Sequence, residues 1–178
     1  MSVDTSKNAS FTRSRIPVEY RSVDSSLTAA GQSGQQVLDW IKLDGLKKIS
    51  SRGVLVEIVG KSALSRDVFY LTARAFAIHS ISVRCVFSLD LLRERMTDDL
   101  KDELDERGVL FVDRMGNDGE PVFSKKDAFE IEVFLEKWIS SGRSLVYRSE
   151  VGIDKNTQWS ESFRFFVKNR LKKSVIVG

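Results

Sequence analysis

The sequence predicts a three-layer α/β domain of the Rossmann-like type, built on a mostly parallel five-stranded sheet. Short, nearly all-apolar runs rich in β-branched residues alternate along the chain with helical patterns. Strands that are apolar on both faces are buried under helices, and strands that alternate with helices pair in parallel through right-handed crossovers. The length of 178 residues is enough for one sizeable core and too little for two ordinary domains.

Five apolar runs are predicted to be strands. The first is followed by Gly60 and the third by Asp113. The predicted strands are Val54–Val59, Val83–Phe87, Val109–Val112, Leu145–Tyr147 and Ser174–Val177.

Helices are predicted between these strands where apolar residues recur three and four positions apart. Ser124 is expected to cap one helix and Gly142 to end it. The stretch Thr28–Gln36 is predicted to be a loop, because Gly31 and Gly34 lie there among polar residues. The predicted helices are Gln35–Lys48, Asp67–Ile78, Ser88–Met96, Asp99–Arg107, the stretch between Ser124 and Gly142, and Ser160–Leu171.

Residues 1–14 are predicted to be a disordered tail, followed by one domain over residues 15–178. The tail has no apolar core of a secretory signal, and no apolar run approaches the ~20 residues needed to cross a bilayer, so no membrane partner is expected. The single cysteine, Cys85, excludes an internal disulfide and fits a reducing compartment, the cytoplasm or an organelle matrix. The net charge of +3 favours an anionic partner.

The turn after the first predicted strand lies where a phosphate-binding loop would be. Such a loop reads G-x-x-x-x-G-K-[ST]: its amides hold phosphates, its lysine neutralises them and its hydroxyl binds Mg²⁺. Here Gly60 opens the motif, but Ser65 replaces the second glycine, Arg66 the lysine and Asp67 the hydroxyl residue. Asp67 is expected at the N-terminus of the next helix, where a carboxylate favours the helix dipole and repels phosphate.

The third predicted strand has the form of a Walker B strand. It reads Gly108-Val-Leu-Phe-Val-Asp113, and Asp113 stands where an aspartate would hold the Mg²⁺ shell. The next position, usually an acidic residue that polarises the attacking water, is Arg114.

Around these landmarks the chain resembles the DnaC/IstB-type helicase loaders of the AAA+ family. The resemblance implies a P-loop NTPase-like fold, ATP and Mg²⁺ as ligands, work with a helicase or recombinase in DNA replication or transposition, and a sensor position at Glu150, where the family has asparagine. It covers residues 15–178 in order and spacing, on the segments Arg15-Ile-Pro-Val-Glu-Tyr-Arg21, Gly53-Val-Leu55, Val83–Leu92, Val109–Gly116, Arg143–Glu150 and Trp159–Val177.

The departures from the family pattern all remove features that an ATPase needs. The loop lysine and hydroxyl, the acidic neighbour of Asp113, the sensor asparagine and a helical lid after the fifth strand are all missing. The sequence therefore predicts a pseudo-ATPase with no catalytic residue, no metal and no cofactor, ATP with Mg²⁺ being the less favoured case. Arg66 is expected to pair with Asp67, Asp113 or Glu150, so that internal charges replace the nucleotide.

Basic residues gather at the last predicted helix and its exit. A solvated face explains them, and so does contact with nucleic-acid phosphates. Phe163 and Phe166 have core spacing, whereas Phe165 is expected to be exposed. The resemblance also implies that Arg164 or Arg170 could reach a neighbour's nucleotide. The basic cluster comprises Arg164, Lys168, Arg170, Lys172 and Lys173.

These observations predict a non-catalytic adaptor in DNA replication or transposition. Its tail and lead-in segment would bind a helicase- or recombinase-like protein, and its basic last helix would touch DNA. Two alternatives stay open: a divergent ATPase that acts as a helicase loader, and a purely structural subunit of a larger assembly. Oligomeric state and the choice between DNA and RNA are not determined by the sequence.

Overall fold

The computed structural model describes residues 11–22, 26–42, 53–93, 104, 108–116 and 123–178. Five strands form one sheet in which every pairing is parallel, in the order β2-β3-β4-β1-β5. The predicted α/β class is confirmed. The strands are β1 (Leu55–Val59), β2 (Val83–Phe87), β3 (Val109–Asp113), β4 (Ser144–Ser149) and β5 (Leu171–Ile176).

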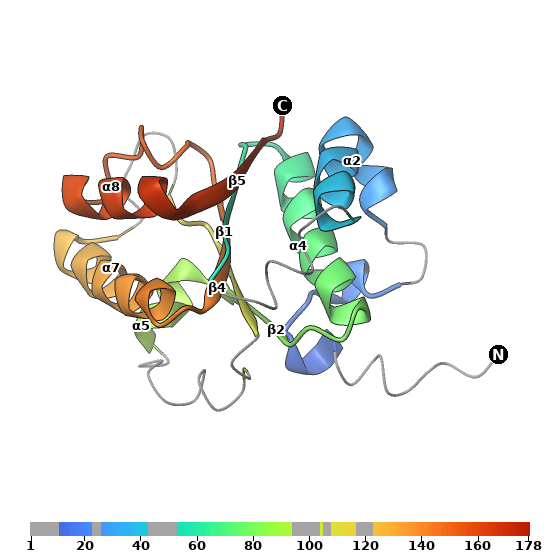
Figure 1. The fold of residues 1–178 in the computed structure, drawn as a ribbon, viewed down its shortest axis with the longest axis horizontal. Coiled ribbons are helices and arrows are strands. Elements are labelled where there is room, and N and C mark those ends of the chain that lie inside the picture. Colours follow the sequence, from blue (N-terminus) through green and yellow to red (C-terminus); the bar gives the residue numbers. More distant parts are fainter. Residues whose placement is uncertain (1–10, 23–25, 43–52, 94–103, 105–107, 117–122) are drawn as a thin grey trace.

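Helices cover both faces of the sheet and make the three layers (Figure 1). One face carries α2, α4 and the short 3-10 helices, and the opposite face carries α5, α7 and α8. The helical elements are η1 (Val18–Tyr20), η2 (Leu27–Ala30), α2 (Gly31–Trp40), α4 (Ala63–Ile78), α5 (Ser88–Arg93), α7 (Lys125–Ser140) and α8 (Glu161–Arg170).

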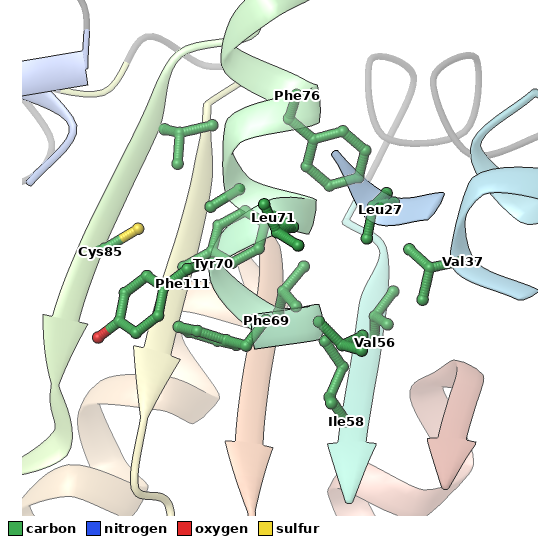
Figure 2. Packing of buried hydrophobic residues seen from close by; sticks show 14 of the residues in the cluster. Leu27, Val37, Val56, Ile58, Phe69, Tyr70, Leu71, Phe76, Cys85 and Phe111 are labelled. Carbon is green, nitrogen blue, oxygen red and sulfur yellow. The ribbon is translucent and has the colours of Figure 1, made fainter. Parts of the chain in front are cut away.

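Successive side chains of each strand point to opposite faces of the sheet, so the interior is divided into two cores, one on each face. On β1, Val56 and Ile58 face α4, whereas Leu55 faces α7 and α8. Figure 2 shows the first core, in which the side chains of α4 fill the space between the sheet and the segment that carries Leu27 and Val37. Burial on both faces explains why β1 to β4 are mostly apolar, whereas the edge strand β5 is largely exposed and contains Lys172 and Lys173.

The predicted loop over Thr28–Gln36 is wrong, because η2 and α2 cover it. Gly34 is buried within α2, and a Cβ there would stand 1.8 Å from the carbonyl oxygen of Leu27. Glycine is therefore needed for a close approach between two helical segments and does not mark a break. Gly31, with a φ of 63°, makes the corner between η2 and α2.

Other element boundaries moved by a few residues. Helix α4 begins four residues earlier than predicted, and β5 follows α8 without a connecting residue. Ser124 accepts a hydrogen bond from the Asp127 amide, and Gly142 has a φ of 82°, as expected of an N-cap and of a helix end. The predicted helix Asp99–Arg107, apart from the buried Leu104, lies outside the described residues.

The segment that precedes η1 belongs to the folded domain. Phe11 packs in the first core, and Ile16 is fully buried there. The Ser14 carbonyl accepts a hydrogen bond of 2.9 Å from the Cys85 amide, so this lead-in segment, residues 11–22, lies against the outer side of β2. The ordered part thus includes at least residues 11–14 of the predicted tail, and residues 1–10 lie outside the described residues.

Candidate functional site: a charge cluster in place of a phosphate loop

Only Gly60, Lys61 and Ser62 connect β1 to α4. The buried Ser65 hydroxyl lies 2.8 Å from the Gly60 and Ser62 carbonyl oxygens, which fixes the turn tightly against the helix. A Cβ on Gly60 would stand 2.6 Å from the Val177 carbonyl oxygen, so the turn is also packed against the chain that follows β5. The eight positions compared with the phosphate-loop motif therefore do not form one loop, because those from Ala63 to Asp67 are the first residues of α4.

Asp67 does not lie at the helix N-terminus, because the helix begins four residues before it. Its carboxylate accepts a hydrogen bond of 2.7 Å from the Tyr20 hydroxyl. Burial and the Asp67 carboxylate raise the pKa of Tyr20, so this hydroxyl stays a donor at neutral pH. Arg66 pairs at 3.2 Å with Glu19 on the surface and lies over the Tyr70 ring. Arg66 was expected to pair with Asp67, Asp113 or Glu150, but its ion pair is with Glu19. Arg66 and Asp67 both hold the lead-in segment onto α4.

Asp113 lies at the end of β3, 1% exposed, with both carboxylate oxygens engaged. Arg148 Nε donates to Oδ1 at 2.5 Å, the Arg114 amide donates to the same oxygen at 2.8 Å, and Tyr70 donates to Oδ2 at 3.2 Å. Burial and the Asp113 charge raise the pKa of Tyr70, which keeps this phenol protonated. The same Arg148 guanidinium reaches the Ser65 hydroxyl at 3.2 Å. A positive side chain thus joins the Walker B-like aspartate to the turn after β1.

Arg148 is the functional residue that the sequence analysis missed. The sheet register pairs Val112 with Tyr147, so the next positions, Asp113 and Arg148, lie side by side at the carboxyl end of adjacent strands. A signal was present: Arg148 is a charge at the end of an otherwise apolar strand, beside another strand that ends in a charge. The order of strands in the sheet was needed to bring the two together.

The neighbouring predicted positions contribute less to this cluster. Arg114 is exposed, has a φ of 61°, and lies with its guanidinium 5.3 Å from the centre of the Phe87 ring. Glu150, the sensor-like residue, is half-buried, and its backbone amide donates to the Gly116 carbonyl at 3.0 Å. The contact of Arg114 with Asp113 comes from its backbone amide.

A second buried carboxylate, that of Glu57 on β1, lies on the opposite face of the sheet from Asp113. Glu57 accepts hydrogen bonds from the Tyr147 hydroxyl at 2.9 Å, the Ile153 amide at 2.7 Å and the Ser174 hydroxyl at 3.0 Å. Burial raises the pKa of Glu57 although these three donors act in the opposite direction, and the nearby Asp154 charge adds to the increase. Its bonds join β1 to β4, β5 and the turn after β4, which indicates a structural role.

The predicted basic cluster divides into two parts. Arg164 donates to the Asp154 carbonyl at 3.0 Å, so it holds the turn before α8. Lys173 is half-buried on β5. Lys168, Arg170 and Lys172 are exposed, and the Arg170 guanidinium lies 4.0 Å from the centre of the Phe166 ring. The structure places the whole cluster on α8 and the start of β5.

The residues at the carboxyl edge of the sheet do not fit a Mg²⁺–nucleotide. A phosphate-binding loop needs open backbone amides before the helix, and here a three-residue turn is packed against Val177. A Mg²⁺ shell needs accessible carboxylate oxygens, and those of Asp113 are taken by Arg148, Tyr70 and Arg114. Within the described part of the chain, no group of three His, Cys, Asp or Glu side chains could hold a metal ion. Nor does any described helix have the length and apolar character needed to cross a membrane.

Comparison with known proteins gives structural relatives. No protein-family sequence model matches the chain, and no curated protein matches it significantly in sequence. The structure of DnaI aligns with a TM-score of 0.60 at 11% identity, covering 93% of this chain and 96% of DnaI. The DnaC helicase loader aligns with a TM-score of 0.59 at 9% identity, covering 91% of this chain and all of that one.

Replication initiators have the same architecture. Domain III of the Thermotoga maritima replication initiation protein DnaA aligns with a TM-score of 0.55 at 11% identity, over 86% of this chain and 68% of that one. The chain spans about half, 51%, of a DnaA bound to AMPPCP and single-stranded DNA. Likenesses at such low identity establish the fold alone, and the chain therefore has the fold seen in the DnaC helicase loader, in DnaI and in domain III of DnaA.

Proposed function

We propose that the protein is a non-catalytic, AAA+-like adaptor that acts in DNA replication or transposition, in the cytoplasm or an organelle matrix. The observation that carries this proposal is the Arg148–Asp113 pair, which puts an internal positive charge on the carboxylate that would otherwise hold the Mg²⁺ shell. The tight turn at Gly60–Ser62 supports it, since phosphates would need this backbone to open.

An internal ion pair makes the fold independent of a ligand. A buried carboxylate without a partner is costly, and in an ATPase the metal and nucleotide supply the compensating charge. Here Arg148 supplies it permanently, with the Ser65 and Tyr70 hydroxyls completing the network. A chain of this kind would be folded whether or not nucleotide is present, as a binding module requires.

The proposed partners are a helicase- or recombinase-like protein and DNA. The structural relatives include a helicase loader, and this analogy of fold is the basis for the class of protein partner. On the lead-in segment, Val18 is 75% exposed between residues that are tied to the core, so it is the apolar group on which such a partner would dock. DNA would contact the exposed basic residues of α8, Lys168 and Arg170.

Thermal unfolding with and without ATP and Mg²⁺ tests the central claim. A ligand at ~100 times its dissociation constant would stabilise the fold by ~2.7 kcal/mol, a shift of several degrees. We expect no shift with millimolar ATP and Mg²⁺. A clear shift that Lys61→Ala abolishes would show that the turn after β1 holds phosphates, and Mg²⁺-dependent hydrolysis lost in Asp113→Ala would establish the divergent ATPase instead.

A further inference from the structure

The short segment after β3 presents one side chain outward from a constrained backbone. Met115, in the middle of this segment, is 2% exposed. Arg114, the residue before it, is exposed and has a φ of 61°, a left-handed conformation that residues with a side chain rarely adopt. Such a conformation persists only where the surrounding contacts over-determine it, and it occurs preferentially at functional sites.

Hydrogen bonds hold this backbone on both sides of Arg114. The Arg114 amide donates to the Asp113 carboxylate at 2.8 Å, and the Arg114 carbonyl accepts from the Ser88 hydroxyl at 2.6 Å. The next carbonyl, that of Met115, accepts from the indole of Trp159 at 2.8 Å. The direction in which the Arg114 side chain leaves the backbone is therefore fixed.

The Arg114 guanidinium lies over an aromatic ring and, among the described residues, has no carboxylate partner. It stands 5.3 Å from the centre of the ring of Phe87, which ends the adjacent strand β2 and is 42% exposed. A ring beneath a guanidinium orders the long side chain and leaves the N–H groups at its edge free to donate.

An ordered guanidinium beside exposed apolar groups matches a carboxylate that is flanked by an apolar side chain. A guanidinium can bind a carboxylate through two parallel hydrogen bonds. Leu89, two residues after Phe87 in the chain, is also 42% exposed, and Asp90 next to it is acidic. A nucleic-acid strand presents a row of phosphates and needs several cations, whereas arginine and aromatic residues are both enriched in protein interfaces. The surroundings of Arg114 therefore favour a protein segment over a nucleic acid.

We propose that the Arg114 site, composed of Arg114, Phe87 and Leu89, binds an acidic protein segment in which a carboxylate lies next to an apolar side chain. Arg114 binds the carboxylate, and Phe87 and Leu89 contact the apolar side chain. The site lies at the carboxyl ends of β2 and β3, whereas the docking group of the proposed function, Val18, is on the lead-in segment. This inference goes beyond the proposed function and does not depend on it.

Fluorescence anisotropy with a dye-labelled peptide of about ten residues that alternates leucine and glutamate tests the proposal on the full chain. Arg114→Gln should weaken binding by at least about 10-fold, because it removes charge-assisted hydrogen bonds to the carboxylate. Phe87→Leu should weaken it by about 2- to 5-fold, because the guanidinium loses its ring. The same peptide with glutamine in place of glutamate should bind at least about 10-fold more weakly to the unaltered protein.

The matched controls change similar groups outside the Arg114 site. Arg170 also lies over a ring, with its guanidinium 4.0 Å from the centre of Phe166, and Arg170→Gln should leave the affinity unchanged. Phe165 on α8 is 68% exposed, as expected from the sequence, and Phe165→Leu is the control for the ring. Equal losses in the site variants and the control variants would show a general attraction of an acidic peptide to a basic chain, and this would overturn the proposal.

Arg114→Gly separates a binding role from a structural one. Glycine adopts a positive φ without strain, so this variant should lose peptide binding and yet melt at or above the temperature of the unaltered protein. A lower melting temperature would show that the fold needs the Arg114 side chain, and it would overturn the proposal.

The proposal is also overturned if the peptide does not bind, if an oligothymidylate binds through Arg114 in its place, or if Arg114 serves only to join copies of this chain. Failure here leaves the adaptor of the proposed function standing, because its partner docks elsewhere. A thermal shift in ATP would overturn that adaptor and leave the Arg114 site untouched.

Discussion

Arg148 and Asp113 illustrate what a single side chain does to this fold. Asp113 is buried and Arg148 is only partly exposed, with side-chain exposures of 1% and 11%, so each largely compensates the other's charge. The energetic consequence is asymmetric: a matched buried pair contributes little net stability, but removing one member leaves an uncompensated charge. The pair is therefore best probed by breaking it.

Arg148→Met should destabilise the protein by about 3–5 kcal/mol, because it leaves the Asp113 carboxylate buried with hydroxyl and amide donors only. Adding Asp113→Asn to the same variant should restore much of the loss, since a neutral amide oxygen still accepts from Tyr70 or Arg114. Urea denaturation measures both. The control is Arg66→Met, which breaks the exposed pair with Glu19 and should cost no more than about 1 kcal/mol. Equal losses at positions 148 and 66 would refute the interpretation.

The buried carboxyl group of Glu57 should make the stability of the protein depend on pH. Because burial raises its pKa above the ordinary value of 4.5, the folded state binds this proton more tightly than the unfolded state does. The resulting stability is complete below the unfolded pKa and is lost as pH rises through the folded pKa. Glu57→Gln cannot ionise, so relative to it the unaltered protein should lose about 1.4 kcal/mol for each unit by which the pKa is raised.

Urea midpoints of the two proteins from about pH 4.5 to about pH 8 give this difference. Glu130→Gln, at an exposed position of α7, is the matched control and should follow the unaltered protein. Parallel pH profiles for Glu57→Gln and the unaltered protein would show that this carboxyl group titrates normally.

At the scale of elements, α2 shows how a close approach overrides local propensity. Gly34→Ala would raise intrinsic helix propensity by about 1 kcal/mol, yet the new Cβ would meet the Leu27 carbonyl. We expect a net loss of about 1–3 kcal/mol, as in other overpacked sites. Gln36→Ala, on the exposed face of the same helix, should be neutral or stabilising. A more stable Gly34→Ala variant would show that η2 and α2 are free to separate.

The positions of the strands could be predicted from the sequence more completely than the contacts between the residues of the candidate site. Apolar β-branched runs located β1 to β4, because burial on both faces leaves a continuous signal. For β5 the predicted range Ser174–Val177 found only the last residues of Leu171–Ile176, because the first part of this edge strand is polar and exposed. The start of α4 was misplaced because the motif comparison put Ser65 and Arg66 in a loop and began the helix at Asp67. Sequence spacing alone could not show that these residues form helix, since their serine, arginine and aspartate fit either state. The Arg148–Asp113 contact depends on strand order, which no local pattern contains.

At the scale of the whole molecule, the lead-in segment and the charge cluster form one connected structure. Tyr20 stacks on Tyr70 and bonds to Asp67, and Tyr70 in turn bonds to Asp113. The segment proposed to dock a partner is thus two side-chain contacts away from the site that would hold a nucleotide in an ATPase.

The two edge strands of the sheet, β2 and β5, differ in what lies beside them. The outer side of β2 is met by the lead-in segment through the Ser14 carbonyl, whereas within the described residues no strand covers the outer side of β5, where Ile176 is 76% exposed. A sheet with one exposed edge strand can be extended there by pairing with a strand of another molecule. Main-chain pairing with another copy would therefore take place more readily at β5 than at β2, where the Cys85 amide already donates to the Ser14 carbonyl.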